Sequence, residues 1–111
     1  KKCMTKPILV FCTVPDSGIA DRISEALIQK KLAACVSWGE PIQSVYRWQG
    51  SVEKATEWNL TIKTVSEKYS EVEKTILSIH PYDVPENISV PILNGLGPYL
   101  KWMNDEIRLE S

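Results

Sequence analysis

Apolar and polar positions at the start of the chain predict a strand followed by a helix. The run Pro7–Val14 is short and rich in Ile, Leu, Val and Phe, which is typical of a buried central strand. Asp16 or Ser17 then stands where a helix cap is expected. Between Ile19 and Lys31 apolar residues return at three- and four-residue steps, so we expect a helix that ends near Lys31.

The middle of the chain predicts a long antiparallel hairpin. Leu32–Val36 is apolar, and after a Gly-Glu-Pro break residues 42–49 alternate in polarity, which indicates one long, kinked strand. Gly50 marks the turn, and Glu57–Thr64 returns with its apolar residues on one face.

The last third predicts two helices on either side of a short strand. Ser66 begins a helix that Pro81 stops. Ile88–Ile92 alternates as a strand, and the proline within it indicates the edge of a sheet. After a Gly- and Pro-containing turn, residues 99–107 carry the apolar side chains of a last helix.

The order of these elements predicts an α+β fold of the ferredoxin-like class, βαββαβ, with a long hairpin and an extra C-terminal helix. A length of 111 residues favours one domain, 1–111. The right-handed crossover of this topology brings Cys12 and His80 to the same end of the molecule, whereas Cys35 begins its strand at the opposite end.

The predicted hairpin is too long for its own sheet. Such a sheet needs strands of about five to eight residues, so we expect the part around Tyr46–Gln49 to project with unpaired backbone. Symmetric copies of the chain would cover it in every subunit. The alternative is that Tyr46 and Trp48 pack beneath the terminal helix of their own chain, but four tryptophans in so short a chain favour the oligomer.

Composition argues against several classes of protein. The 13 Lys and Arg balance the 14 Asp and Glu, so no nucleic-acid partner is expected. No apolar run reaches the length of a secretory or membrane-spanning segment, which predicts a cytoplasmic protein without membrane insertion. Cysteines that are odd in number and unpatterned indicate reduced thiols.

The segment His80–Glu86 concentrates the polar chemistry of the chain. It holds the only histidine, a tyrosine and two carboxylates around Pro81 and Pro85, which restrict the loop backbone. These groups are too few to specify a reaction. A hydrolase of the acylphosphatase type shares the predicted topology, but residues 13–18 contain neither an arginine nor a glycine-rich anion cradle, so we do not expect this hydrolase activity.

Five ordered blocks extend over essentially the whole chain, namely Leu32–Val36, Ser44–Gly50, Ile62–Thr64, His80–Glu86 and Tyr99–Trp102. In order and spacing these blocks resemble the CutA divalent-cation tolerance proteins. The resemblance implies a homotrimer with the architecture of the PII signalling proteins, whose long hairpins are exchanged around the threefold axis. It also implies tolerance of copper and other divalent cations, a response to metal ions, and neither catalysis nor an organic cofactor.

By the same resemblance, the copper ligands proposed for the family fall on Cys12 and His80. Some bacterial members have two adjacent histidines there, whereas this chain has Ile79 in place of the first. A thiolate and an imidazole suit copper, but Asp16, Glu86, water or another subunit must complete the site. The alternatives are that Cys12 is a small hydrophobic residue of a buried strand and that backbone carbonyls satisfy His80.

A second hypothesis is a PII-like signalling or interaction module that binds a small ligand or a protein, with metal binding incidental. Six residues of the family-like blocks combine aromatic walls with one charge of each sign, which suits a small polar ligand in an inter-subunit cleft. The competing explanation is interface packing, with Lys63 paired to a carboxylate. The six residues are Tyr46, Trp48, Lys63, Tyr82, Glu86 and Trp102.

Overall fold

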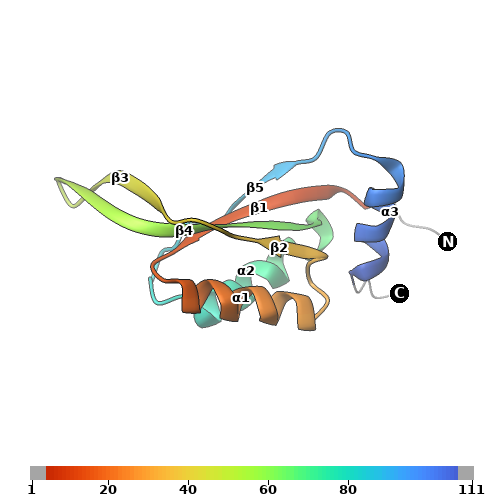
Figure 1. The fold of residues 1–111 in the computed structure, drawn as a ribbon, viewed down its shortest axis with the longest axis horizontal. Coiled ribbons are helices and arrows are strands. Elements are labelled where there is room, and N and C mark those ends of the chain that lie inside the picture. Colours follow the sequence, from red (N-terminus) through yellow and green to blue (C-terminus); the bar gives the residue numbers. More distant parts are fainter. Residues whose placement is uncertain (1–4, 108–111) are drawn as a thin grey trace.

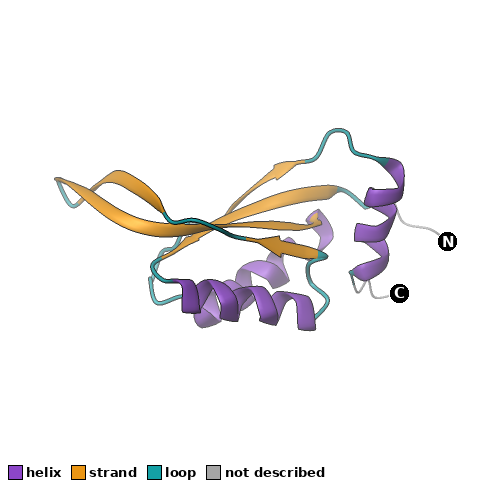
Figure 2. Cartoon of the chain, viewed as in Figure 1, coloured by secondary structure: helices purple, strands orange, loops and turns teal. Residues whose placement is uncertain are grey.

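Two helices cover one face of an antiparallel sheet in the computed structural model, which describes residues 5–107 (Figure 1). Strands, helices and loops are distinguished in Figure 2. The mixed α+β class predicted from the sequence is confirmed. In chain order the elements are β1 (Pro7–Val14), α1 (Ser17–Gln29), β2 (Cys35–Ser37), β3 (Ile42–Trp48), β4 (Ser51–Val65), the 3-10 turn η1 (Ser66–Lys68), α2 (Tyr69–Ile79), β5 (Ile88–Pro91) and α3 (Gly97–Glu106).

Strands β1 and β4 form the centre of the sheet. The strand order is β2-β4-β1-β5, and each neighbouring pair is antiparallel. Strand β5 is an edge, as its proline predicts; Pro91, its last residue, has no N–H for a further partner. Every second residue of β1 is buried, since one side of the strand faces the helices. These residues are Ile8, Val10, Cys12 and Val14.

The two helices pack their apolar stripes on this face of the sheet. Asp16 precedes helix α1, and its carboxylate accepts a hydrogen bond from the Ile19 N–H at 2.9 Å, so Asp16 rather than Ser17 is the cap. The side chains that complete the core are Ala20, Ile23 and Leu27 of α1 and Val72 and Ile76 of α2.

Strand β4 is long enough to pair with β3 along its first part and with β1 and β2 along its last part. Its last residues pair with β1 and β2, whereas its first part pairs with β3 from Trp48↔Ser51 to Ile42↔Glu57. The β3–β4 hairpin therefore projects beyond the helices, as expected from the sequence (Figure 1). The single kinked strand expected before Gly50 is divided into β2 and β3, because the break at residues 38–41 does not pair.

The hairpin tip turns on two residues with positive φ. Gln49 has a φ of 49° and Gly50 a φ of 83°, between the last pair of β3 and β4. This is the two-residue turn that matches the right-handed twist of a hairpin. Glycine has no Cβ and adopts the larger φ of the second turn position without strain, which explains Gly50 there.

The alternative, in which Tyr46 and Trp48 pack beneath the terminal helix of their own chain, is wrong. Tyr46 is 45% exposed and Trp48 is 56% exposed. Figure 1 shows the reason, since β3 and α3 lie at opposite ends of the molecule. Helix α3 instead buries Met103 near the start of β1, where the Thr5 hydroxyl donates to Asn104 Oδ1 at 2.8 Å. Within residues 5–107 no helix is long and apolar enough to cross a membrane.

Candidate functional site

His80 ties the end of α2 to the end of β1. Its Nε2 lies 2.8 Å from the carbonyl oxygen of Thr13, and its Nδ1 lies 3.2 Å from the backbone nitrogen of Tyr82. Because Nδ1 accepts the Tyr82 N–H, the ring hydrogen belongs on Nε2, which donates to Thr13. Both nitrogens of this buried, 7% exposed imidazole are therefore engaged within the chain.

Cys12 approaches the same carbonyl from the core side of β1. Its side chain is fully buried, and its Sγ lies 3.8 Å from the carbonyl oxygen of Thr13. Burial raises the pKa of the Cys12 thiol to about 12, and the negative charges of Glu86 and Glu57 add to the rise. Cys12 and His80 thus meet at one end of the molecule, as the topology predicts, and Cys12 is there a neutral thiol.

This pair is not a ready-made metal centre. Metal binding needs a thiolate and a free imidazole lone pair, whereas Cys12 holds its proton and both nitrogens of His80 are engaged. The Asp16 carboxylate, one of the alternatives for completing the site, caps α1. In the described part of the chain no three His, Cys, Asp or Glu side chains are grouped so as to hold a metal ion. The metal site therefore stays a prediction.

Cys35 lies apart from this pair, on the short edge strand β2. Its Sγ lies 3.7 Å from Ser37 Oγ and 4.0 Å from Lys63 Nζ. The expected pairing of Lys63 with a carboxylate is not seen, because no ion pair among residues 5–107 includes Lys63. Cys3 falls outside the described residues.

The six proposed cleft residues form separate groups within one chain. Tyr82 stacks at a tilt on His80 with ring centroids 4.9 Å apart, and its pKa is raised by burial and then by Glu57 and Tyr46. Trp102 instead contacts Tyr99 on α3, with centroids 5.4 Å apart. Since β3 and α3 lie at opposite ends, a cleft containing all six residues requires more than one copy of the chain.

Glu57 is a residue of this region that sequence reasoning missed. It is only 7% exposed at the base of the hairpin, opposite Ile42, and it raises the pKa of Cys12. In the sequence it occupies a polar position of an alternating strand, where a solvent-facing side chain is expected. The periodicity contains no signal for its burial.

Comparisons with known sequences agree over nearly the whole chain. The family described as "CutA1 divalent ion tolerance protein" matches residues 8–106. The chain is 45% identical over 95 residues to the Protein CutA homolog of Xenopus laevis, a match that covers 86% of this chain and 63% of that protein. It is 37% identical over 97 residues to the Divalent-cation tolerance protein CutA of Thermus thermophilus, covering 87% of this chain and 94% of that protein.

Comparison with solved structures agrees with the sequence matches. The crystal structure of CutA1 from the psychrotrophic bacterium Shewanella sp. SIB1 is similar with a TM-score of 0.90 at 40% identity, covering 95% of this chain and 98% of that chain. Sequence and fold therefore agree, and the chain belongs to the CutA1 divalent ion tolerance family.

Proposed function

We propose that this protein acts in divalent-cation tolerance as a homotrimer that binds metal ions, copper among them, as its cargo and catalyses no reaction. The observation that carries the proposal is the approach of Cys12 and His80 to one carbonyl oxygen, in a chain of this family. A thiol and an imidazole are a suitable ligand pair for copper, above all in its softer reduced state. A cytoplasmic location stays a prediction.

The homotrimer is supported by the apolar side chains that a single chain leaves exposed. On the hairpin, Tyr46, Trp48, Val45 and Val52 are between 45% and 63% exposed, and β3 has a backbone partner on one side only. Such an edge is a template for another strand. Cyclic copies would bury the same residues in each subunit, which is why a closed oligomer explains the long hairpin.

Metal binding by Cys12 and His80 requires two local changes. The thiol must lose its proton, and His80 must release either the Tyr82 N–H or the Thr13 carbonyl. Because the proton competes with the metal, the affinity is expected to rise with pH. Glu86 is close enough to act on the charge of Cys12 and would favour a bound cation for the same reason that it disfavours the thiolate.

Native mass spectrometry with and without copper and zinc tests the subunit count and the metal together. The variants are Cys12→Ala and His80→Ala, and Cys35→Ala is the matched control because it removes a thiol far from His80. All forms carry Cys3→Ser, since another thiol would bind metal independently. We expect a trimer that holds about one copper per subunit and loses it in both variants but keeps it in the control.

Two outcomes would contradict this proposal. Copper retention that is unchanged in both Cys12→Ala and His80→Ala would remove the metal site, and a monomer would remove the trimer. Mass spectrometry reports the number of subunits and the number of bound metal ions separately. A negative result for the trimer therefore leaves metal binding measurable, and a negative result for metal binding leaves the trimer measurable.

The second candidate function is a PII-like module that binds a small ligand between subunits. It is favoured by Lys63, which makes no ion pair among the described residues, and by the exposed aromatic rings of Tyr46, Trp48 and Trp102. A thermal-shift screen of the trimer with nucleotides and small anions tests it, with Lys63→Gln as the variant. A ligand that stabilises the wild type but not Lys63→Gln supports the cleft, and the absence of any shift would eliminate it.

A further inference from the structure

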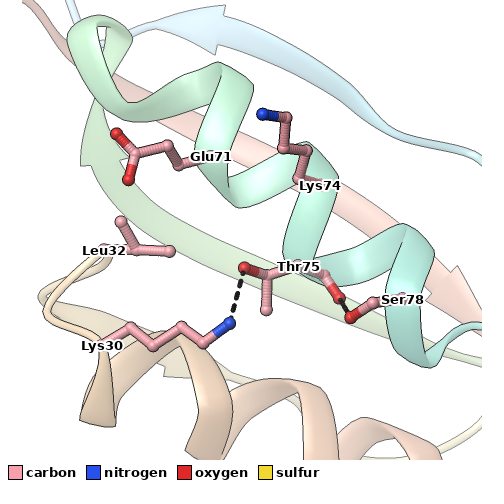
Figure 3. Close-up of a pocket in the computed structure, with 6 residues that line it drawn as sticks. All are labelled: Lys30, Leu32, Glu71, Lys74, Thr75 and Ser78. Carbon is pink, nitrogen blue, oxygen red and sulfur yellow. Dashed lines mark hydrogen bonds between the residues drawn. The ribbon is translucent and has the colours of Figure 1, made fainter.

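A groove of about 540 Å³ lies between the C-terminal end of α1 and the side of α2 (Figure 3). It shares no residue with the Cys12–His80 pair or with the proposed cleft, so its argument is independent of the proposed function. Its size is within the range of small-molecule sites. The residues that line it are Lys30, Leu32, Glu71, Lys74, Thr75 and Ser78.

The floor of the groove presents a hydroxyl donor beside an ammonium group. Thr75 is only 5% exposed, and its Oγ1 accepts from Lys30 Nζ at 3.5 Å, as the dashed line in Figure 3 shows. The hydroxyl hydrogen of Thr75 has no acceptor among residues 5–107. The Ser78 hydroxyl already donates its hydrogen to the Thr75 carbonyl oxygen at 2.7 Å, so toward a ligand Ser78 Oγ can act only as an acceptor. Thr75 is therefore a buried donor available to a ligand.

The charges around this donor favour an anion. Neither Lys30 nor Lys74 forms an ion pair within the described part of the chain. The one carboxylate of the groove, Glu71, lies 3.6 Å from Lys68 Nζ, which balances its charge. Lys30 thus brings an ammonium group without a counter-charge to the Thr75 hydroxyl. Lys74 adds a second such group to the lining of the groove, and a doubly charged oxyanion would neutralise both.

We propose that this groove binds a phosphomonoester, a small organic molecule whose phosphate contacts Lys30, Lys74 and Thr75. The dianion matches the two ammonium groups, and its oxygens accept from the Thr75 hydroxyl. The groove is larger than a phosphate alone requires, and Leu32 supplies an apolar wall for the organic part. The Glu71 carboxylate would accept a hydrogen bond from a hydroxyl group of the ligand.

Amide chemical shifts of the full-length protein test the site with ribose 5-phosphate, inorganic phosphate and ribose. We expect saturable shifts at residues 30–32 and 71–78 with ribose 5-phosphate, weaker binding of inorganic phosphate and no response to ribose. Lys74→Gln removes one ammonium and Thr75→Val removes the donor, and each should raise the Kd roughly tenfold. Lys101→Gln is the matched control, because it removes an exposed lysine on α3 that pairs with Asp105.

Three results would overturn the proposal. One is the absence of saturable shifts at these residues. Another is an equal loss of binding in Lys101→Gln, which would reduce the effect to general electrostatic attraction. A third is loss of binding in Lys63→Gln but not in Lys74→Gln, which would place the ligand in the inter-subunit cleft. Lys74 is exposed, so its variant remains a test even if Thr75→Val does not fold.

Discussion

His80 donates its Nε2–H to the carbonyl oxygen of Thr13 over 2.8 Å, although 67 positions separate the two residues in the sequence. This bond fixes where α2 ends relative to β1, and the Tyr82 N–H on Nδ1 fixes how the next loop leaves the helix. The only histidine of the chain is thus a structural connection, and a metal ion would have to compete with it.

We predict that His80→Ala lowers the free energy of unfolding by about 1–3 kcal/mol, because it removes a buried donor and leaves the Thr13 carbonyl without it. His80→Gln should recover part of the loss, since its amide can still donate. Asp83→Ala, an exposed change in the same loop, is the control and should stay within about 0.5 kcal/mol of the wild type. Urea unfolding measures all three, and equal stability of His80→Ala and the control would contradict the role of this bond.

Stability should fall above pH 9 because of Cys12. Its pKa is raised from 9.0 to about 12 in the fold, first by burial and then by Glu86 and Glu57. Between these values the unfolded chain loses the proton while the folded chain keeps it. The contribution of the protonated Cys12 thiol to the free energy of unfolding is therefore fully present below pH 9 and is lost as the pH rises toward 12. The raised pKa values of Tyr69 and Tyr82 act in the same direction.

Urea unfolding from pH 7 to pH 11 checks this prediction. Cys12→Ala should lose stability at pH 7 but show a shallower decline above pH 9 than the wild type. Val10→Ala is the control, because it shortens an equally buried side chain of the same strand without removing a titrating group. Declines of equal steepness in the wild type and Cys12→Ala would refute the assignment.

The hairpin turn should be sensitive to Gly50. We expect Gly50→Ala to lower stability by about 1–2 kcal/mol, because a side chain at a φ of 83° clashes with its own backbone. No neighbouring atom lies within 4 Å of an added Cβ, so the loss comes from the backbone alone. Gln49→Asn should act in the opposite direction, since asparagine tolerates positive φ.

Thermal unfolding compares these turn variants with Gly39→Ala. Gly39 has equally open surroundings but no positive φ, so its substitution should change little. If Gly39→Ala and Gly50→Ala were equally destabilised, the turn conformation would not be the cause.

The cap of α1 provides a smaller, local test. Asp16→Ala should lower the free energy of unfolding by about 1 kcal/mol, because the Ile19 N–H loses its acceptor. Asp16→Asn keeps a side-chain oxygen and should retain most of the stability. Ser17→Ala, the neighbouring candidate, should be nearly neutral, and a loss as large as that of Asp16→Ala would make Ser17 part of the cap.

Periodic segments were predictable where one face of an element is buried by its own chain. Strand β1 was predicted at Pro7–Val14 because each of its core positions is apolar. The start of β4 was missed, with Glu57 expected where Ser51 begins the strand. Most residues of that part are exposed on both faces, so the alternation that indicates a strand is weak there.

The candidate site was predictable in place but not in detail. Topology alone brought Cys12 and His80 to one end, which the shared Thr13 carbonyl confirms. The occupied nitrogens of His80, the buried Glu57 and the groove at Thr75 depend on contacts between distant segments. Such contacts leave no local pattern in the sequence.

The 15 residues of β4 also determine how quickly the proposed homotrimer would form. The half that pairs with β1 and β2 needs only its own chain, so this part can fold at a rate independent of protein concentration. The half in the β3–β4 hairpin exposes apolar side chains in the single chain, and only the proposed homotrimer would cover them. In a homotrimer, refolding should therefore show a fast unimolecular phase and a later phase that accelerates with concentration, both carried by one continuous strand.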